Sequence, residues 1–570
     1  MIRGSRRHGL TAAVGLLAAV LLTVTGQGVA TAAPAPAGTV ALRVIGINDF
    51  HGNLEPPAGS SGRVVLADGT TVDAGGAAYL ATHLAQLRAA VTDSVFVGQG
   101  DLIGASPLAS ALFHDEPTIA LFRMLGMRTS AAGNHEFDEG YAELLRMQKG
   151  GCHPVDGCQF RPTFPGTGFP YLAANVTLKQ SQIPAMLPTW VSQVQGVPVG
   201  YIGMPLEGTP GIVAAAGIKN LTFGAEIAAA NRYADVLDRL GVKTIVLLVH
   251  QGDGVEANNP PDACGIVPGA GREIAAGVSP KIDVVFAGHS HQQFDCMVND
   301  PAGNPRPYIQ AAAFGRMLSV VDLTIDRKTR DVVRSATVAT NHVVTRTVTP
   351  DPAAQALVDD ARTKAAPIGN RPVGTITADI VRAAAPSGES PLGNLIADSQ
   401  LEQTAAATAQ IAFMNPGGVR ADLTFPSSTA GEGNGVVSYA EAFTVQPFGN
   451  VMTTLTLTGA QLKTVLEQQW QPTVTRMLAP SQGFTYTYGP TLPVGSRVTN
   501  MALGGTPIAP DTSYRVSVNN FLADGGDGFA GFTAGTDRTG GVVDLDAFTA
   551  YLTAHPNVAP PATNRITVAG

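Results

Sequence analysis

The segment "VALRVIGINDFHGN", residues 40–53, changes from apolar to polar at one point in the chain. Residues 40–47 are mostly apolar and rich in β-branched side chains, whereas the next residues include Asn48, Asp49 and His51. Apolar runs without strict alternation are typical of strands buried in a largely parallel or mixed sheet. We therefore predict a buried strand that ends in a polar loop.

The same pattern recurs four times before residue 300. "SVFVGQ" (94–99), "TIVLLV" (244–249) and "IDVVFA" (282–287) precede "GD", "HQGD" and "GHSH", respectively. "GMRTSAA" (126–132), with fewer β-branched residues, precedes "GNHEFD" (133–138). Amphipathic helical stretches such as 77–91 and 225–241 separate these runs, which predicts an α/β fold. In open α/β sheets, ligands bind outside the carboxyl ends of the strands, so we expect the five strand ends to meet.

Five of the eleven histidines follow these strands. Unrelated surface turns would not place so many histidines at strand ends. A single Asp or His after a strand is usually a turn or hydrogen-bonding residue, but together they favour a metal centre. Mixed oxygen and imidazole ligands without thiolate suit Zn, Mn, Fe, Co or Mg. Seven candidates exceed the four ligands of one tetrahedral metal and suit two divalent ions about 3.5–4 Å apart that share a carboxylate. The candidates are Asp49, His51, Asp101, Asn134, His250, His289 and His291.

The order D-x-H, GD, GNHE-x-x-D, H and GH-x-H resembles the calcineurin-like metallophosphoesterase superfamily. The segments "INDFHGNLEP", "AAGNHEFDEG" and "FAGHSH" resemble its secreted 5′-nucleotidase/UDP-sugar hydrolase branch. The resemblance implies an N-terminal four-layer α/β/β/α sandwich, a linking helix and a C-terminal α+β substrate-binding domain. We expect these at residues 40–345, 346–370 and 371–567, with helical spacing at 351–366.

The resemblance also implies a role for each residue of the centre. Asp49, His51 and His291 would hold one metal, and Asn134, His250 and His289 the other, with Asp101 between them. The metals would activate water for in-line attack on phosphorus. His135 would be no ligand but would donate to a phosphoryl or leaving oxygen, oriented by Asp138. Glu136 and Phe137 receive no chemical role and are interpreted as local capping and packing residues.

Four polar, glycine-containing segments mark the C-terminal region. "SPLGNLIADSQL" predicts a helix with Ser390 as its cap and Pro391 at its first position. From the resemblance, Phe448 and Phe521 would sandwich the base, and Asp527 would accept from ribose hydroxyls. Many relatives have an Arg shortly before the "GNL" helix, where this chain has residues 387–390, "SGES", with Arg382 further upstream. The expected substrate-binding residues are Asn134, Asn415, Arg420, Phe448, Phe521 and Asp527, with Arg420 on the phosphate and Asn415 near the nucleoside.

The first 32 residues resemble a signal peptide. "MIRGSRRHG" is a basic start, "LTAAVGLLAAVLLTVTG" is apolar, and "ATA" at 30–32 offers small residues for cleavage. The alternative is an uncleaved membrane anchor, although the apolar run is short for a span of about 20 residues. We expect a protein that is secreted or held in the cell envelope, with no membrane span after cleavage.

The four cysteines suit an oxidising compartment. Three pairings are open, and Cys152–Cys158 with Cys264–Cys296 requires the least loop closure. Zinc binding is the alternative, but the spacing of a zinc site is absent.

Length and charge bound the class of protein. The 570 residues exceed the size at which single cores stop growing, which favours two domains. A net charge of −8 argues against a partner that is a nucleic acid polymer, but it is compatible with a local basic pocket for one phosphate. The resemblance to the 5′-nucleotidase branch implies a small nucleotide as the substrate. The expected reaction converts nucleoside 5′-monophosphates to nucleoside and phosphate, with UDP-sugar hydrolysis as a companion activity. The alternatives are a 2′,3′-cyclic-nucleotide 2′-phosphodiesterase/3′-nucleotidase and a non-catalytic nucleotide-binding or adhesion protein.

Overall fold

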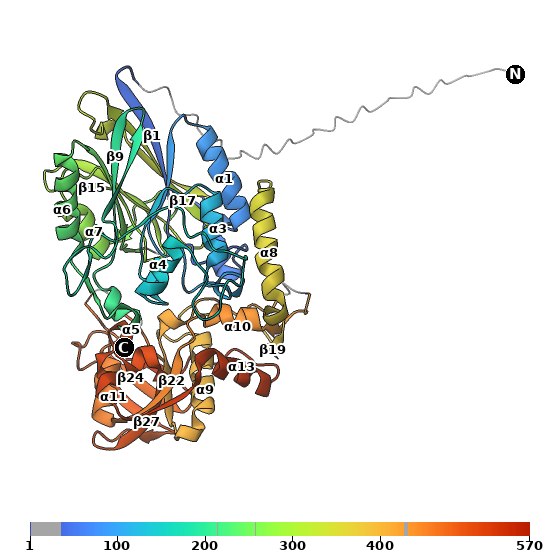
Figure 1. Ribbon diagram of the computed structural model, residues 1–570. Helices are drawn as coiled ribbons and strands as arrows, with labels where there is room; N and C mark the ends of the chain where they lie inside the picture. The colour runs from blue at the N-terminus through green and yellow to red at the C-terminus, as the bar shows by residue number, and fades with distance from the viewer. Residues whose placement is uncertain (2–35, 214, 257, 427–430, 473, 570) are drawn as a thin grey trace.

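The computed structural model describes Met1 and residues 36–213, 215–256, 258–426, 431–472 and 474–569. The predicted signal peptide, apart from Met1, lies outside these residues. The chain forms an N-terminal lobe from β1 to β18 and a C-terminal lobe from β19 to β29, joined along one side by α8 (Figure 1). Over the described ranges, no helix has both the length and the hydropathy required to cross a bilayer.

The first sheet of the N-terminal lobe has the strand order β18-β17-β1-β4-β5-β6. Strands β1, β4, β5 and β6 are parallel neighbours, whereas β17 pairs antiparallel with β1 and with β18. The loops after β1, β4 and β5 therefore leave the same edge of the sheet. The bounds are β1 Thr39–Ile47, β4 Ser94–Gly98, β5 Thr129–Ala131, β6 Tyr171–Leu172, β17 Met317–Asp326 and β18 Val338–Val343.

The second sheet has the order β15-β16-β14-β11-β9-β8. Strands β16, β14, β11 and β9 are parallel, with β15 and β8 antiparallel at the two edges. His250 is the last residue of β11, and "GHSH" follows β14 by one residue. The bounds are β8 Thr189–Val194, β9 Val197–Pro205, β11 Thr244–His250, β14 Val284–Phe286, β15 Gln293–Asn299 and β16 Pro305–Ala311.

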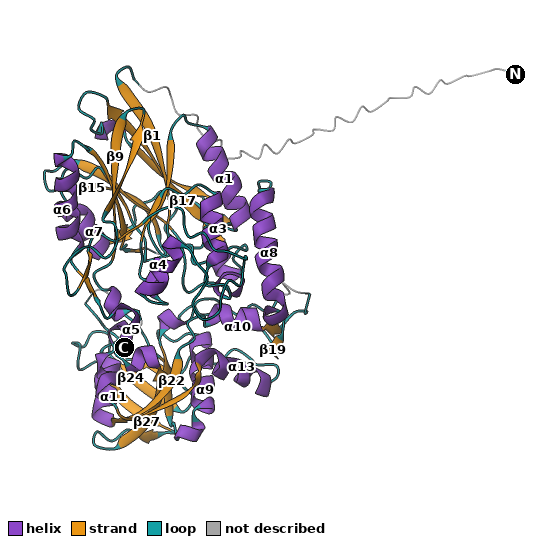
Figure 2. Cartoon of the chain, in the orientation of Figure 1, coloured by secondary structure: helices purple, strands orange, loops and turns teal. Residues whose placement is uncertain are grey.

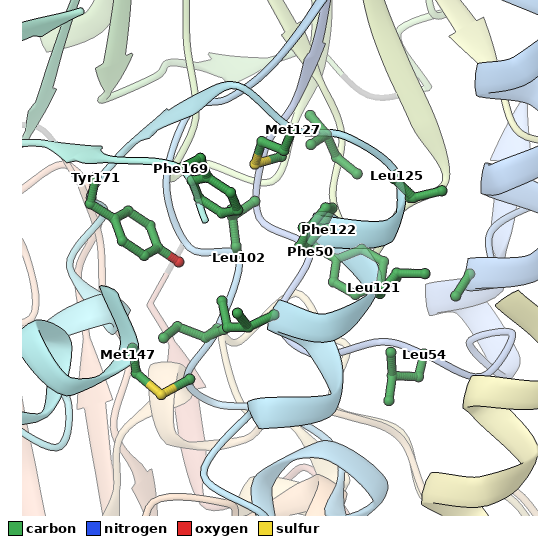
Figure 3. Packing of buried hydrophobic residues seen from close by; sticks show 14 of the residues in the cluster. Phe50, Leu54, Leu102, Leu121, Phe122, Leu125, Met127, Met147, Phe169 and Tyr171 are labelled. Atoms are coloured by element: carbon green, nitrogen blue, oxygen red, sulfur yellow. The ribbon is translucent and has the colours of Figure 1, made fainter. Parts of the chain in front are cut away.

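The two sheets pack face to face, and helices cover both outer faces (Figure 2). Val44 and Val97 of the first sheet share a buried cluster with Val246 and Phe286 of the second. Helices α1 (Ala77–Ala89) and α3 (Glu116–Met124) cover the first sheet, where Phe50 and Phe122 pack among aliphatic side chains (Figure 3). Helices α6 (Glu226–Arg239) and α7 (Ala270–Gly277) cover the second sheet. The predicted α/β/β/α sandwich is confirmed.

Helix α8 (Pro352–Gly369) is the predicted linking helix. Asp351 accepts hydrogen bonds from the N–H groups of Ala353 and Ala354, and Pro352 occupies the first helical position, where no N–H is needed. The helix runs three residues beyond the expected end at 366. Pro367 lies in its last turn, and the N–H of Asn370 still donates to Ala366 O. Helix α8 packs on α1, α2 (Leu108–Ala111) and α3 in one lobe and on α10 (Tyr439–Val445) in the other.

The C-terminal lobe is α+β, as predicted. A five-stranded sheet (β23-β20-β27-β22-β28) and a four-stranded sheet (β26-β25-β24-β29) pack with helices α9 to α13. Ser390 Oγ accepts from Gly393 N at 2.9 Å, which confirms the predicted cap of α9. The bounds are α9 Pro391–Gln403, α11 Gly459–Glu467, α12 Asn520–Ala523, α13 Asp544–Ala554, β20 Ile411–Met414, β22 Val451–Thr458, β23 Ala479–Pro480, β24 Phe484–Tyr488, β25 Val498–Leu503, β26 Thr506–Pro507, β27 Ser513–Asn519, β28 Thr536–Val543 and β29 Ile566–Val568.

The remaining elements are short and connect these layers. Disulfides join Cys152 to Cys158 and Cys264 to Cys296, which confirms the local pairing and leaves no cysteine for a metal. The short elements are β2 Arg63–Val65, β3 Thr71–Asp73, β7 Val176–Leu178, β10 Leu221–Phe223, β12 Gly254–Val255, β13 Ile266–Val267, β19 Pro372–Thr375, β21 Val436–Ser438, α4 Tyr141–Lys149 and α5 Ala215–Ile218.

Candidate active site

The structure brings together the polar residues at all five strand ends. Asp101, after β4, is central: its Oδ2 lies 2.9 Å from His250 Nε2 and 3.7 Å from His51 Nε2. Asp49 Oδ1 lies 3.5 Å from His291 Nε2 and 3.9 Å from His51 Nε2. Residues from both sheets therefore converge because their parallel strands end at the same side of the sandwich.

Asn134 completes the arrangement from the loop after β5. Its Oδ1 lies 3.2 Å from His250 Nε2 and 3.0 Å from His289 Nδ1. The side chains form one group of Asp49, His51 and His291 and a second of Asp101, His250 and His289, with Asn134 beside the second. Asp101 also forms a third group with His51 and His135, so it stands between the first two groups and His135 adjoins them. All seven candidates thus lie at one centre.

The donor atoms of this centre fit divalent cations. His51 Nδ1 donates to Gly104 O at 2.8 Å, so its Nε2 presents a lone pair to His291 Nε2 at 3.0 Å. His250 Nδ1 contacts Gln99 O at 2.8 Å, which directs its Nε2 toward the oxygens of Asp101 and Asn134. Oxygen and imidazole lone pairs that face each other this closely require a proton or a cation between them. Imidazole and carboxylate ligands are suited to Zn, Mn, Fe or Co.

Protons would compete with a metal ion for the imidazole nitrogens and carboxylate oxygens of this centre. Burial opposes charge on His250, but the nearby carboxylates of Asp101 and Asp49 raise its pKa to about 9. Burial raises the pKa of Asp49 to about 7, and the charge of Asp101 adds to this effect. Burial lowers the pKa of His289 to about 3, so its imidazole is neutral and available as a ligand.

The backbone at the centre adopts an unusual conformation. Asp49 (φ 50°), His51 (47°), Asp101 (50°), His289 (72°) and His291 (58°) all lie in the left-handed region that non-glycine residues rarely adopt. Such residues cost about 1–3 kcal/mol each and persist where the surroundings force them, often at functional sites. Five of the seven candidates therefore have an unfavourable backbone conformation that the surrounding structure maintains. The sequence does not reveal this feature.

Asn48 and Glu136 support the centre and were not predicted to do so. Asn48 Nδ2 donates to Asp49 Oδ2 at 2.7 Å and to the carbonyl of Ala312. The buried Glu136 carboxylate accepts from the N–H groups of Asp101 and Leu102 at 2.8 and 2.9 Å. Glu136 is thus more than a capping residue of its own turn, because it fixes a loop 35 residues earlier in the chain.

His135 and Asp138 form the predicted pair. His135 Nδ1 lies 2.7 Å from Asp138 Oδ2, and the backbone N–H of His135 donates to Asp101 Oδ1 at 2.8 Å. Burial disfavours the imidazolium, but Asp138 and Asp101 outweigh it and raise the pKa of His135. Phe137, between them in sequence, is fully buried against Phe223, which confirms its packing role.

The C-terminal lobe closes over this side of the centre. The rings of Phe448 and His135 stack with centroids 5.7 Å apart and planes inclined by 21°. Arg420 Cζ lies 5.8 Å from the Phe448 ring centre, and its buried Nη2 has no hydrogen-bond partner among the described residues. The expected sandwich of a base by Phe448 and Phe521 stays a prediction, since Phe448 here lies on His135.

Asn415 and Asp527 meet at a second point of the C-terminal lobe. Asn415 Nδ2 donates to Asp527 Oδ2 at 2.7 Å, and Arg476 Nε lies 3.5 Å from Asp527 Oδ1. Arg476 was not predicted. Burial is the main cause of the lowered pKa of His289, and the positive charge of Arg476 adds a smaller effect of the same sign. Phe521 packs beside the turn of Asp527, where a Cβ added to Gly526 would lie 2.5 Å from its ring. The substrate candidates of this lobe therefore form two groups: Phe448 and Arg420 beside His135, and Asn415 and Phe521 around Asp527.

A separate cluster contains His114, Glu139 and His153. His114 Nδ1 contacts Glu139 Oε2 at 2.8 Å, and its Nε2 contacts Asp156 Oδ2 at 2.9 Å. These carboxylates raise the pKa of His114 to about 9 despite partial burial. At neutral pH a protonated His114 therefore donates to both carboxylates, and the cluster needs no metal ion.

Comparisons with known proteins agree with the geometry. Residues 42–293 match the family described as Calcineurin-like phosphoesterase, and residues 372–534 match 5′-nucleotidase, C-terminal domain. The chain is similar to "Cell wall protein Lmo0130" of Listeria monocytogenes serovar 1/2a (strain ATCC BAA-679 / EGD-e), with 32% identity over 94% of this chain and 70% of that protein.

The chain belongs to the 5′-nucleotidase family. The fold matches the crystal structure of a 5′-nucleotidase precursor from Thermus thermophilus with a TM-score of 0.77 and 26% identity, over 93% of this chain and 99% of that one. The chain is also 34% identical to "Endonuclease YhcR" of Bacillus subtilis (strain 168) over 86% of its own length, but it spans only 37% of that protein. It is thus a metallophosphoesterase of this family, of the hydrolase class.

One departure from the pattern of the 5′-nucleotidase family has a structural explanation. In the "SGES" segment, Glu389 is fully buried and accepts from the backbone N–H groups of Arg565 at 3.1 Å and Ile566 at 2.8 Å. Glu389 therefore has a structural role, because it joins the start of α9 to β29. Arg382, further upstream, lines a cavity together with His291.

Proposed function

We propose that this protein hydrolyses nucleoside 5′-monophosphates to nucleoside and phosphate with two divalent metal ions. The observation that carries the proposal is the convergence of all seven candidate ligands at one centre, within electrostatic reach of Arg420, whose buried Nη2 has no hydrogen-bond partner among the described residues. Cations held by these side chains would supply positive charge to a phosphate, and the Arg420 guanidinium would supply hydrogen-bond donors to it. We infer that residues 40–345 supply the catalytic centre, 346–370 the linker and 371–567 the nucleoside site.

In this proposal, Asp49, His51 and His291 hold one ion, Asn134, His250 and His289 hold the other, and Asp101 lies between them. Bound ions of this kind supply activation of the attacking water and neutralisation of the phosphate charge. Asn48, Glu136 and Gly104 keep the ligands in place by hydrogen bonds to Asp49, the Asp101 loop and His51. Such supporting contacts typically change metal affinity by about 10–100-fold.

His135 acts on the substrate and not on a metal. Asp138 accepts the Nδ1 proton, which orients the ring and stabilises its charged form. The Nε2 proton is then available for a phosphoryl oxygen or for the leaving 5′ oxygen. A positioned acid of this kind contributes about 10²–10⁴-fold to the rate.

The C-terminal lobe holds the rest of the substrate. Arg420, with Asn134 opposite, contacts the phosphate, while Asn415 and Asp527 face the nucleoside. Phe448 leaves its stack on His135 and, with Phe521, binds the base, each stacked base being worth about 1–3 kcal/mol. Stacking tolerates any base, which suits a hydrolase with broad nucleotide preference.

We also infer that the protein acts outside the cytoplasm. The two disulfides are typical of oxidising compartments, and a similar protein is named a cell wall protein. The basic and apolar start of the sequence supports export.

The experiment is phosphate release by purified protein reconstituted with Zn²⁺, Mn²⁺ or Co²⁺. AMP should be hydrolysed and EDTA should abolish the activity, with 2′,3′-cyclic AMP, 3′-AMP and UDP-glucose as parallel arms. Preference for the cyclic and 3′ substrates would assign the alternative diesterase/3′-nucleotidase activity. No EDTA-sensitive release from any arm would favour the non-catalytic binder.

A further inference from the structure

A cavity of about 400 Å³ opens beside the metal centre. His291 and the neighbouring Phe314 form part of its wall, so the cavity adjoins the ligands of one metal. Arg63 of the β2–β3 hairpin, Arg316 before β17, and Arg382 of the C-terminal lobe also line it. Ligand pockets typically measure about 300–1,000 Å³, so the cavity has room for one nucleotide unit.

The cavity has a strong excess of positive charge. Its lining contains the three arginines and one acidic residue, Glu256, in a chain of net charge −8. Arg63 has only a loose, exposed contact with Asp73, with Nε and Oδ1 3.8 Å apart. The charge of the whole chain therefore conceals a local basic region, which is what attracts an anionic ligand.

Arg316 is held in place by backbone atoms. Its Nε donates to Ala313 O at 3.0 Å and its Nη1 to Arg63 O at 2.9 Å. Neither acceptor carries a full charge, so both fix the guanidinium without neutralising it. Burial lowers the pKa of Arg316 to about 10, and repulsion from Arg382 adds to this effect.

The arginines continue from the cavity to the proposed phosphate site. Burial lowers the pKa of both Arg316 and Arg420, and repulsion from Arg382, which lies between them, adds to the effect on each. Cations held this close together are relieved by anions placed between them. A single phosphate at the metal centre would meet Arg420 and leave Arg316 on its two backbone carbonyls and Arg63 with its loose contact to Asp73.

We propose that this basic cavity binds a second phosphate of the substrate, so that the protein also takes short single-stranded oligonucleotides. The proposal rests on the proposed function of the metal centre, where the scissile phosphate would lie. The nucleoside on one side of that phosphate occupies the C-terminal lobe, and the neighbouring nucleotide extends past His291 toward Arg63, Arg316 and Arg382.

The chemistry is the hydrolysis of a phosphodiester. A water oxygen forms a new bond to phosphorus, and one ester P–O bond breaks. The leaving oxygen takes one proton, for which His135 is placed, and the second proton of water passes to solvent. The products are one fragment with a terminal phosphate and one with a free hydroxyl.

Binding of a fluorescein-labelled phosphorothioate tetrathymidylate tests the proposal. Fluorescence anisotropy over a series of salt concentrations would compare the wild type with Arg63→Ala and Arg316→Gln. Arg316→Gln removes the charge and keeps a donor for the two carbonyls. Each variant should weaken binding about tenfold, as expected for a lost charged hydrogen bond. Each should also lower the slope of log Kd against log salt by about 0.7, the value for one phosphate contact on a single strand.

Arg239→Ala is the matched control, because Arg239 is an exposed residue of α6 on the outer face of the other sheet. Thermal melts confirm that each variant folds. Slopes and Kd values equal to those of Arg239→Ala in both cavity variants would overturn the proposal. Loss of UDP-glucose hydrolysis without any change in oligonucleotide binding would assign the cavity to pyrophosphate substrates and also overturn it. AMP hydrolysis by the wild type, measured in parallel, tests the proposed function separately.

Discussion

The carboxylate of Glu136 accepts a hydrogen bond from the backbone N–H of Asp101 at 2.8 Å, although the two residues belong to different loops. Glu136→Gln replaces one acceptor oxygen by an NH₂ group that faces a backbone N–H. The Asp101 loop should then shift, and metal affinity should fall about 10–100-fold. Titration of the metal-free protein with Zn²⁺ in the presence of a competing chelator measures the change.

Glu139→Gln is the control for that substitution. Glu139 lies three residues later and is half exposed, and its carboxylate contacts His114 and not the Asp101 loop. It should leave metal affinity unchanged. Equal affinities for both variants would show that Glu136 does not support the centre.

Metal binding should strengthen as the pH rises. In the metal-free protein the pKa of His250 is raised to about 9 and that of Asp49 to about 7. Both groups must lose their protons before they can ligate, so affinity should rise between about pH 6 and pH 9 and then level off. Near pH 8, His250 is still largely protonated, and binding should release about one proton. Calorimetry in buffers of different ionisation enthalpy detects that proton, and a flat pH profile without release would contradict the assignment.

His135→Ala should lower turnover of AMP by about 10²–10⁴-fold while the metal content stays the same. The reason is that Nδ1 of His135 is engaged by Asp138, which leaves the Nε2 proton for the substrate. Metal analysis of the purified variant, alongside steady-state kinetics, separates the two effects. A variant that lost one metal would identify His135 as a ligand instead.

Asp138→Asn should move the alkaline limb of the kcat profile to lower pH. Asp138 helps to raise the pKa of His135, and a charged His135 is fully present below that pKa and lost as the pH rises through it. Removing the negative charge lowers the pKa, so activity should disappear earlier on the alkaline side. An unchanged profile in this variant would mean that another group limits the rate at high pH.

The sequence predicted which residues gather at this centre better than it predicted the contacts that support them. Asp49 and His291 lie in the short polar segments that follow apolar runs, so their place at strand ends could be inferred from nearby residues. Glu136 and Asp101 are 35 residues apart, and their contact runs through backbone N–H groups that every residue has. No pattern of side chains marks such a contact in advance. The positive φ values at Asp49 and His51 could not be predicted either. Glycine is the residue that usually indicates a positive φ in a sequence, and neither position is a glycine.

The distribution of charge could not be predicted from the sequence. The net charge of −8 is a sum over the whole chain and argued against polyanionic partners. The fold brings Arg63, Arg316 and Arg382 together around one cavity, from positions up to 319 residues apart. The predicted linking helix also ran past its expected end. Pro367 removes one intrahelical hydrogen bond, to the carbonyl of Thr363, yet α8 continues to Gly369 and the N–H of Asn370 still donates to Ala366 O.

Phe448→Ala should raise the KM for AMP far more than the KM for p-nitrophenyl phosphate. In the structure Phe448 stacks on His135 at 5.7 Å, so the ring has two candidate partners, the imidazole and a substrate base. If it binds the base, its loss removes about 1–3 kcal/mol of stacking from AMP and none from a substrate without a base. If its main function is to position His135, kcat for both substrates should fall together and the two KM values should change alike. The ratio of the two KM changes therefore decides which contact Phe448 makes during turnover.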